Sequence, residues 1–165
     1  MKIAIISDTH DNLPNLQKTL KFCQKEDIAQ IIHCGDVCSR DTLAEFSADW
    51  IEKFYLSFGN ADFTKDLEFG AAATKKIVIF DSIGKAEIGG LDLAFCHFPE
   101  IASSLASEDK YDFVFHGHTH KPWLEQVGKS ILACPGNVAN LYFAPSFAIL
   151  DTKTKKLELK LLNKI

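Results

Sequence analysis

Arginine is almost absent from this sequence of 165 residues, because only Arg40 is an arginine among 18 lysines and arginines. The chain also has 22 acidic residues and a formal net charge of −4, so it has no basic surplus from which to build a nucleic-acid-binding face. Any phosphate group that the protein binds must therefore be held by local groups rather than by a general positive field.

Long apolar runs and paired cysteines are missing as well. The run Ile3 to Ile6 is too short for a signal peptide, and no window reaches the ~18 apolar residues that a membrane helix needs. The five cysteines are odd in number and form no C-x-x-C pair, which predicts reduced core thiols and a cytoplasmic protein. The length and the 47% apolar content predict one domain over residues 1–165, and whether it forms a homo-oligomer stays open.

Short apolar runs alternate with helix-spaced apolar residues over the first 60 positions. Strands are expected at 2–7, 30–34 and 54–58, and helices are expected from Leu13 and from Thr42. A strand–helix–strand–helix–strand order is typical of a parallel α/β arrangement.

The rest of the chain is richer in strands. A helix is expected over 99–107, and Gly89-Gly90 and Gly128-Lys129 have the composition of hairpin turns. The strand-like runs are 77–80, 86–88, 91–96, 113–116, 122–127, 130–133, 146–150 and 157–161. We therefore predict an α/β fold in which two β-sheets pack face to face with helices outside.

Polar residues follow each of the first three predicted strands. They are Asp8, then Gly35-Asp36, then Gly59-Asn60. Each is ordinary alone, since Asp8 or Asp11 could cap the next helix and Gly-Asp is common in turns. Ligands of open parallel sheets bind beyond the carboxyl ends of the strands, so together these ends deliver oxygen ligands to one rim.

Histidines are concentrated in one short segment. Three of the six lie within His116–His120, directly after a predicted strand. Imidazole is a common ligand of transition metals, and a solvated loop rarely needs three such rings, so this cluster favours a metal site over packing. His97 also ends a predicted strand, and it becomes a candidate ligand in the company of the others.

The five motifs Asp-x-His, Gly-Asp, Gly-Asn, His and Gly-His-Thr-His occur in that order, each at a strand end. In this respect the sequence resembles the calcineurin-like metallophosphoesterase superfamily. The length and the start MKIAIISDTHD resemble its small bacterial and archaeal single-domain phosphodiesterases. The resemblance extends from Lys2 to about Leu162 and implies two sheets flanked by helices, with metals at the strand ends.

The resemblance also implies a dinuclear metal site. One ion would take Asp8, His10, Asp36 and His120, and the other would take Asp36, Asn60, His97 and His118. Asp36 would bridge the ions, and Asp36 and Asn60 would serve catalysis directly. Such nitrogen and oxygen ligands suit Mn²⁺, Fe, Ni²⁺ or Zn²⁺. The implied reaction is hydrolysis of small-molecule phosphate esters, diesters above all, by a hydroxide that the two metals activate.

Three positions depart from the family pattern. Ala61 stands where many relatives have a histidine that is thought to protonate the leaving group, Pro99 stands where relatives often have a second histidine, and Asn137 replaces a serine. We interpret Asp62 as a turn aspartate. His33 and His116 have no ligand role in this scheme and are predicted to be structural.

Two further functions stay open at this point. A trafficking-scaffold subunit of the same family has an altered metal site, whereas this chain keeps all seven candidate ligands, which favours an enzyme. A phosphomonoesterase or nucleotidase could use the same site, because ester preference comes from the surrounding loops.

Overall fold

The first half of the chain forms most of one sheet and the three helices that pack beside it. The computed structural model describes residues 1–72 and 74–165. The elements in order are β1 (Lys2–Ile6), α1 (Leu13–Lys25), β2 (Gln30–His33), α2 (Arg40–Ala44), a 3₁₀ turn (Glu45–Ser47), β3 (Lys53–Ser57), α3 (Thr64–Ala71) and β4 (Ile77–Phe80). Strands β1 to β3 are parallel neighbours, as the alternation of strands and helices predicted, and β4 adds a further parallel strand beside β3.

The second half forms the other sheet and then returns to the first. Its elements are β5 (Ile83–Ile88), β6 (Leu91–Cys96), α4 (Pro99–Ala106), β7 (Phe113–Phe115), β8 (Trp123–Val127), β9 (Ser130–Cys134), β10 (Ser146–Asp151), β11 (Lys156–Leu161) and a 3₁₀ turn (Leu162–Lys164). The six-stranded sheet has the order β11-β10-β1-β2-β3-β4, and the five-stranded sheet has the order β5-β6-β7-β9-β8.

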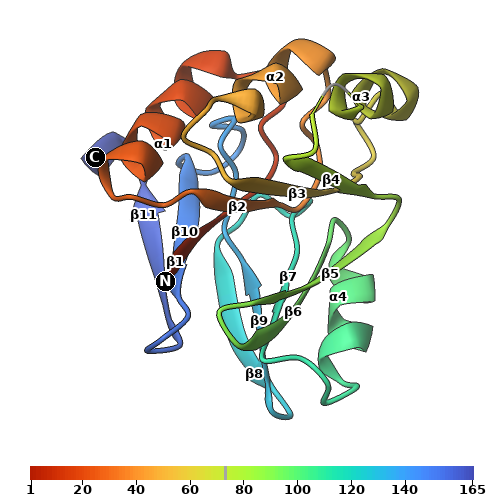
Figure 1. Cartoon of the computed structure of the whole chain (residues 1–165). Helices are drawn as coiled ribbons and strands as arrows, with labels where there is room; N and C mark the ends of the chain where they lie inside the picture. The colour runs from red at the N-terminus through yellow and green to blue at the C-terminus, as the bar shows by residue number, and fades with distance from the viewer. Residues whose placement is uncertain (73) are drawn as a thin grey trace.

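The layers follow from the alternation of side chains along the strands. In β1, Ile3 and Ile5 enter the core between the two sheets, whereas Ala4 and Ile6 face the core beneath the helices. Figure 1 shows α1, α2 and α3 beside the six-stranded sheet and α4 beside the other sheet. A third apolar cluster lies under α4. The predicted fold, two packed sheets flanked by helices in four layers, is confirmed.

Local predictions were mostly confirmed. Registers Ile88–Leu91 and Val127–Ser130 leave two-residue loops at the predicted hairpins. Helix α3 was not predicted, because Phe63 provides no side-chain cap and Leu67 is the one buried residue of this helix. Without an apolar stripe or a capping residue, a short helix leaves little trace in a sequence.

All five cysteines are free and buried, as expected of core thiols. Among the described residues, the helices are too short or too polar to cross a bilayer.

Candidate metal centre

The loops that follow β1, β2, β6 and β7 are tied to one another by backbone hydrogen bonds. Asp8 N donates to Gly35 O at 3.0 Å, and Thr9 N donates to Asp36 O at 2.9 Å. Gly117 N donates to His97 O at 3.1 Å, which joins the two strand ends of the second sheet. Parallel strands thus bring residues that are far apart in sequence to one edge, as predicted from the polar strand ends.

The backbone of the candidate ligands is unusual. Left-handed φ angles of 43° to 66° occur at five of the seven. These five are Asp8, His10, Asp36, His118 and His120. Non-glycine residues rarely adopt positive φ, and strained conformations of this kind concentrate at functional sites. The fold therefore holds these side chains in place at a conformational cost.

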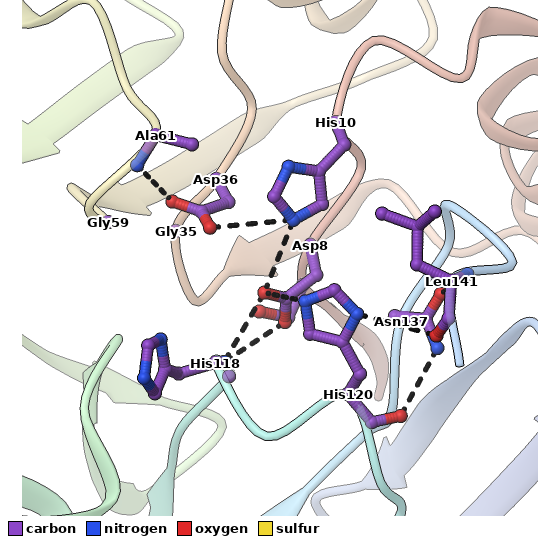
Figure 2. A network of polar contacts seen from close by, with 12 residues as sticks. Asp8, His10, Gly35, Asp36, Gly59, Ala61, His118, His120, Asn137 and Leu141 are labelled. Carbon is purple, nitrogen blue, oxygen red and sulfur yellow. Dashed lines mark hydrogen bonds and ion pairs between the residues drawn. The ribbon is translucent and has the colours of Figure 1, made fainter. Parts of the chain in front are cut away.

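The first group of side chains gathers around Asp8. His120 Nε2 lies 3.2 Å from Asp8 Oδ1, and His10 Nε2 lies 3.8 Å from the same oxygen. Figure 2 shows the rings of His10 and His120 pointing toward the Asp8 carboxylate. His118 reaches that carboxylate through its backbone N–H, at 3.1 Å from Oδ2. Within the part of the chain that the structure describes, the side chains of Asp8, His10 and His120 form one of two clusters whose ligand atoms lie within 4.8 Å of one another.

The second group gathers around Asp36. Its Oδ2 lies 3.4 Å from Nε2 of both His10 and His97, and its Oδ1 accepts from Ala61 N at 2.8 Å. Asn60 Oδ1 lies 3.1 Å from His97 Nε2 and 3.0 Å from His118 Nδ1. One carboxylate oxygen is thus equally distant from a histidine of each group, which is the position that a bridging ligand needs.

The histidines are oriented by contacts on their other ring nitrogen. His97 Nδ1 lies 2.8 Å from Cys34 O, and His120 Nδ1 lies 3.4 Å from Leu141 O. A carbonyl there holds the proton on Nδ1 and leaves the Nε2 lone pair for a metal. His10 Nδ1 instead lies 3.7 Å from Cys38 Sγ. This contact of the Cys38 thiol could not be predicted from the sequence, because it depends on the backbone conformation after Asp36.

The carboxylates of the centre favour positive charge on the side chains around them. Burial is the largest single influence on His97 and opposes its charged form, but the bond to Asp36, the charges of Asp36 and Asp8 and the bond to Cys34 O together outweigh burial, so the pKa of His97 is raised. Burial likewise opposes ionisation of Asp36, but His97, the N–H of Ala61 and His10 together outweigh burial, and the pKa of Asp36 is lowered. A bond to Asp8 raises the pKa of His120. Carboxylates and imidazoles here stabilise positive charge between them.

One buried atom tests whether a metal fits. His10 Nε2 is buried and has no hydrogen-bond partner, although two carboxylates lie within 3.8 Å of it. A buried polar atom without a partner is costly. A divalent cation between His10, Asp8 and Asp36 would satisfy it, and the nitrogen and oxygen donors are those that transition metals prefer.

His33 and His116 are structural, as predicted. Burial lowers the pKa of His33 to about 3, so its ring is neutral. Its Nδ1 accepts from Gly35 N, and its Nε2 therefore donates to Thr9 Oγ1 at 2.8 Å. Burial also lowers the pKa of His116, whose Nδ1 lies 2.9 Å from Gly117 O. Both rings support the loops that carry the candidate ligands.

Two glycines of the motifs are required by close approach. A side chain at Gly59 would collide with the Asp36 carboxylate, and one at Gly117 would collide with Ser7 and Asp8. The glycines in Gly-Asn and Gly-His-Thr-His therefore leave space for the carboxylates.

Asp62 is a turn aspartate, but it does more than close one turn. Its Oδ2 accepts from Gly59 N at 2.7 Å and from Asp36 N at 3.0 Å, and its Oδ1 accepts from Cys38 N at 2.7 Å. Burial raises the pKa of Asp62 even though these three N–H groups favour the charged form. The carboxylate thereby joins the loop that carries Asp36 to the loop that carries Asn60.

This network predicts that Asp62→Asn destabilises the protein. An amide nitrogen would face at least one N–H donor, and an unsatisfied buried donor costs ~1–3 kcal/mol. We expect the free energy of unfolding, measured by urea denaturation, to fall by about that amount. Asp81→Asn, at an exposed position, is the matched control and should change it little. Equal stability of the two variants would contradict the role given to Asp62.

Comparison with known proteins agrees with this geometry. Residues 1–155 match the family model of the calcineurin-like phosphoesterase superfamily domain. The chain is 31% identical over 160 residues to Phosphodiesterase MJ0936 of Methanocaldococcus jannaschii. This alignment covers 94% of this chain and 96% of the relative.

Solved structures give the same result. A structure described as a novel archaeal phosphodiesterase superposes with a TM-score of 0.88 at 30% identity, covering 98% of this chain and 99% of that one. Vps29 of Entamoeba histolytica in complex with Zn²⁺ shares the fold, with a TM-score of 0.69 at 17% identity over 99% of this chain and 100% of that one. The fold, the polar strand ends and the match over most of the length agree: the chain belongs to the calcineurin-like phosphoesterase superfamily.

Proposed function

We propose that the protein is a metal-dependent phosphodiesterase with a dinuclear centre. The observation that carries the proposal is the placement of Asp36 Oδ2, at 3.4 Å from a histidine of each group. Similarity to Phosphodiesterase MJ0936 over nearly the whole chain supports phosphodiesters as the substrate class.

The proposed ligand sets divide the site in two. Asp8, His10, Asp36 and His120 would hold one ion, and Asp36, Asn60, His97 and His118 would hold the other. When bound, two divalent ions supply an activated water and positive charge for the phosphate. Two aspartates leave that charge partly uncompensated, so the site attracts an anionic diester without arginines. Manganese, iron, nickel or zinc would suit these donors.

Exposure indicates how substrate reaches the site. Asp8, Asp36 and His97 are buried, whereas Asn60 and His118 are exposed. The side chains at the rim are therefore the ones beside which the phosphate enters. His97 Nδ1 donates to Cys34 O and His120 Nδ1 donates to Leu141 O, and these bonds fix both rings as the ester binds.

Metal content is the direct test of this proposal. After reconstitution with Mn²⁺ and removal of free metal, elemental analysis should find two ions per chain, and bis(4-nitrophenyl) phosphate should be hydrolysed only by the loaded protein. His116→Asn keeps a donor toward Gly117 O and should retain both ions. One ion or none per chain would overturn the dinuclear centre. Comparison with 4-nitrophenyl phosphate separates a diesterase from a monoesterase.

A further inference from the structure

Tyr142 is an aromatic residue that the fold leaves in solvent beside the metal centre. Its side chain is 91% exposed, although its ring centroid lies only 5.6 Å from that of His120. Its neighbours Leu141 and Phe143 are also exposed. An aromatic ring left in water forgoes the free energy that burial would provide, so the cause of its exposure lies in what holds it there.

The loop that carries Tyr142 is anchored by buried Asn137. The Asn137 amide donates to His120 O at 3.1 Å and to Phe143 O at 3.4 Å, and its oxygen accepts from Leu141 N at 2.9 Å. Figure 2 shows the bonds of Asn137 to His120 and Leu141. Asn137 thus fixes both sides of Tyr142 to the strand end that carries His120.

The backbone at Tyr142 is strained in the same way as the backbone at a candidate ligand. Phe143 N donates to Leu141 O at 2.7 Å around Tyr142, whose φ is 62°. Thr119 N donates to Gly117 O at 2.7 Å around His118, whose φ is 66°. A γ-turn with positive φ at its centre is rare and strained. Such strain persists where the surroundings enforce it and points to a functional role.

A second aromatic residue borders the other half of the site. The ring of Phe98 lies 5.1 Å from that of His97 and 5.1 Å from that of His118, and Phe98 is half-buried. Phe98 therefore touches histidines of one proposed ion site, and Tyr142 touches a histidine of the other. A phosphodiester bound between the histidines has two ester groups, which extend from the phosphorus atom in different directions.

We propose that Tyr142, together with Phe98, selects phosphodiesters whose ester groups carry planar aromatic rings, such as aryl groups or nucleobases. This inference rests on the proposed function, since it names the substrate class of the same site. Stacking on an exposed aromatic side chain suits any flat ring, whatever its hydrogen-bonding pattern. Tyr142 is thus a specificity-determining residue, and it takes no part in bond breaking.

Binding of phosphonates tests the proposal without turnover, because their carbon–phosphorus bond is not an ester. We expect calorimetry on the Mn²⁺-loaded protein to give a Kd about tenfold lower for 1-naphthylphosphonate than for methylphosphonate, with phenylphosphonate between them. Tyr142→Ala should reduce this difference to about twofold, whereas Tyr142→Phe should keep it. Phe69→Ala removes a different exposed aromatic ring, 68% exposed on α3, and should also keep the difference.

Two results would overturn the inference. One is equal Kd values of the unsubstituted protein for the three phosphonates. The other is a Tyr142→Ala variant that keeps the full difference in Kd between 1-naphthylphosphonate and methylphosphonate. Sedimentation that shows a dimer lost in Tyr142→Ala, with the phosphonate difference unchanged, would instead assign the loop to self-association. Failure of the proposed function looks different, because the phosphonate difference would then persist in a protein that hydrolyses no diester.

Discussion

Asp36→Asn should lose metal and phosphodiester hydrolysis far more severely than Asn60→Ala. The Asp36 oxygen faces both proposed ions, so its loss weakens two sites and removes a negative charge between them. Asn60 offers one neutral oxygen, from an exposed side chain, to a single ion. Contacts that merely orient a ligand are worth ~10–100-fold in metal affinity, so a shared ligand should exceed that range.

The choice of substitution at Asp36 matters. Its φ of 62° is tolerated by asparagine but strains alanine, and its Oδ1 accepts from Ala61 N. Asp36→Asn retains the shape and an acceptor for that bond, so thermal unfolding of the metal-free variants should differ little. Metal content from elemental analysis and initial rates on bis(4-nitrophenyl) phosphate give the comparison. A larger loss in Asn60→Ala would show that Asp36 is not the bridge.

Hydrolysis should depend steeply on the acidity of the leaving group. Ala61 cannot protonate a departing oxygen, and Asp62 is occupied by three backbone N–H donors. General acid catalysis typically contributes ~10²–10⁴-fold. Diesters of acidic phenols leave as stable anions and need no proton, so they should react readily. Dialkyl diesters should be slower by about that factor beyond their intrinsic difference.

A series of methyl aryl phosphates with increasing phenol pKa measures this slope. Ala61→His should flatten it if the new ring reaches the leaving oxygen, whereas Ala61→Gln, similar in size but unable to act as an acid, should leave it steep. Rates that do not change with solvent viscosity must first show that the chemical step limits the rate. A flat slope in the natural chain would then reveal an acid other than residue 61.

The strand ends could be predicted because they depend on simple rules. Short apolar runs ending at Asp8, Asp36 and Asn60 indicate parallel strands whose polar ends meet at one edge. His97 became a candidate ligand only in the company of the other histidines, because one histidine after a strand is uninformative alone.

The contacts that surround these residues could not be predicted. Cys38 meets His10 from a backbone with a φ of 77°, and Tyr142 stands beside His120 with a φ of 62°. Neither residue type favours such angles, which arise only when neighbouring loops impose them. Helix α3 could not be predicted for a different reason. Its sequence has neither a capping residue nor an apolar stripe.

The candidate centre draws its ligands from both sheets. Asp8, Asp36 and Asn60 follow strands of the six-stranded sheet, whereas His97, His118 and His120 follow strands of the other. An ion held between them binds the native arrangement and not the unfolded chain. By thermodynamic linkage, ~100-fold excess of free metal over Kd then adds ~2.7 kcal/mol to stability for each ion. The concentration of free metal around the protein would therefore set its folded population and its lifetime, in addition to its activity.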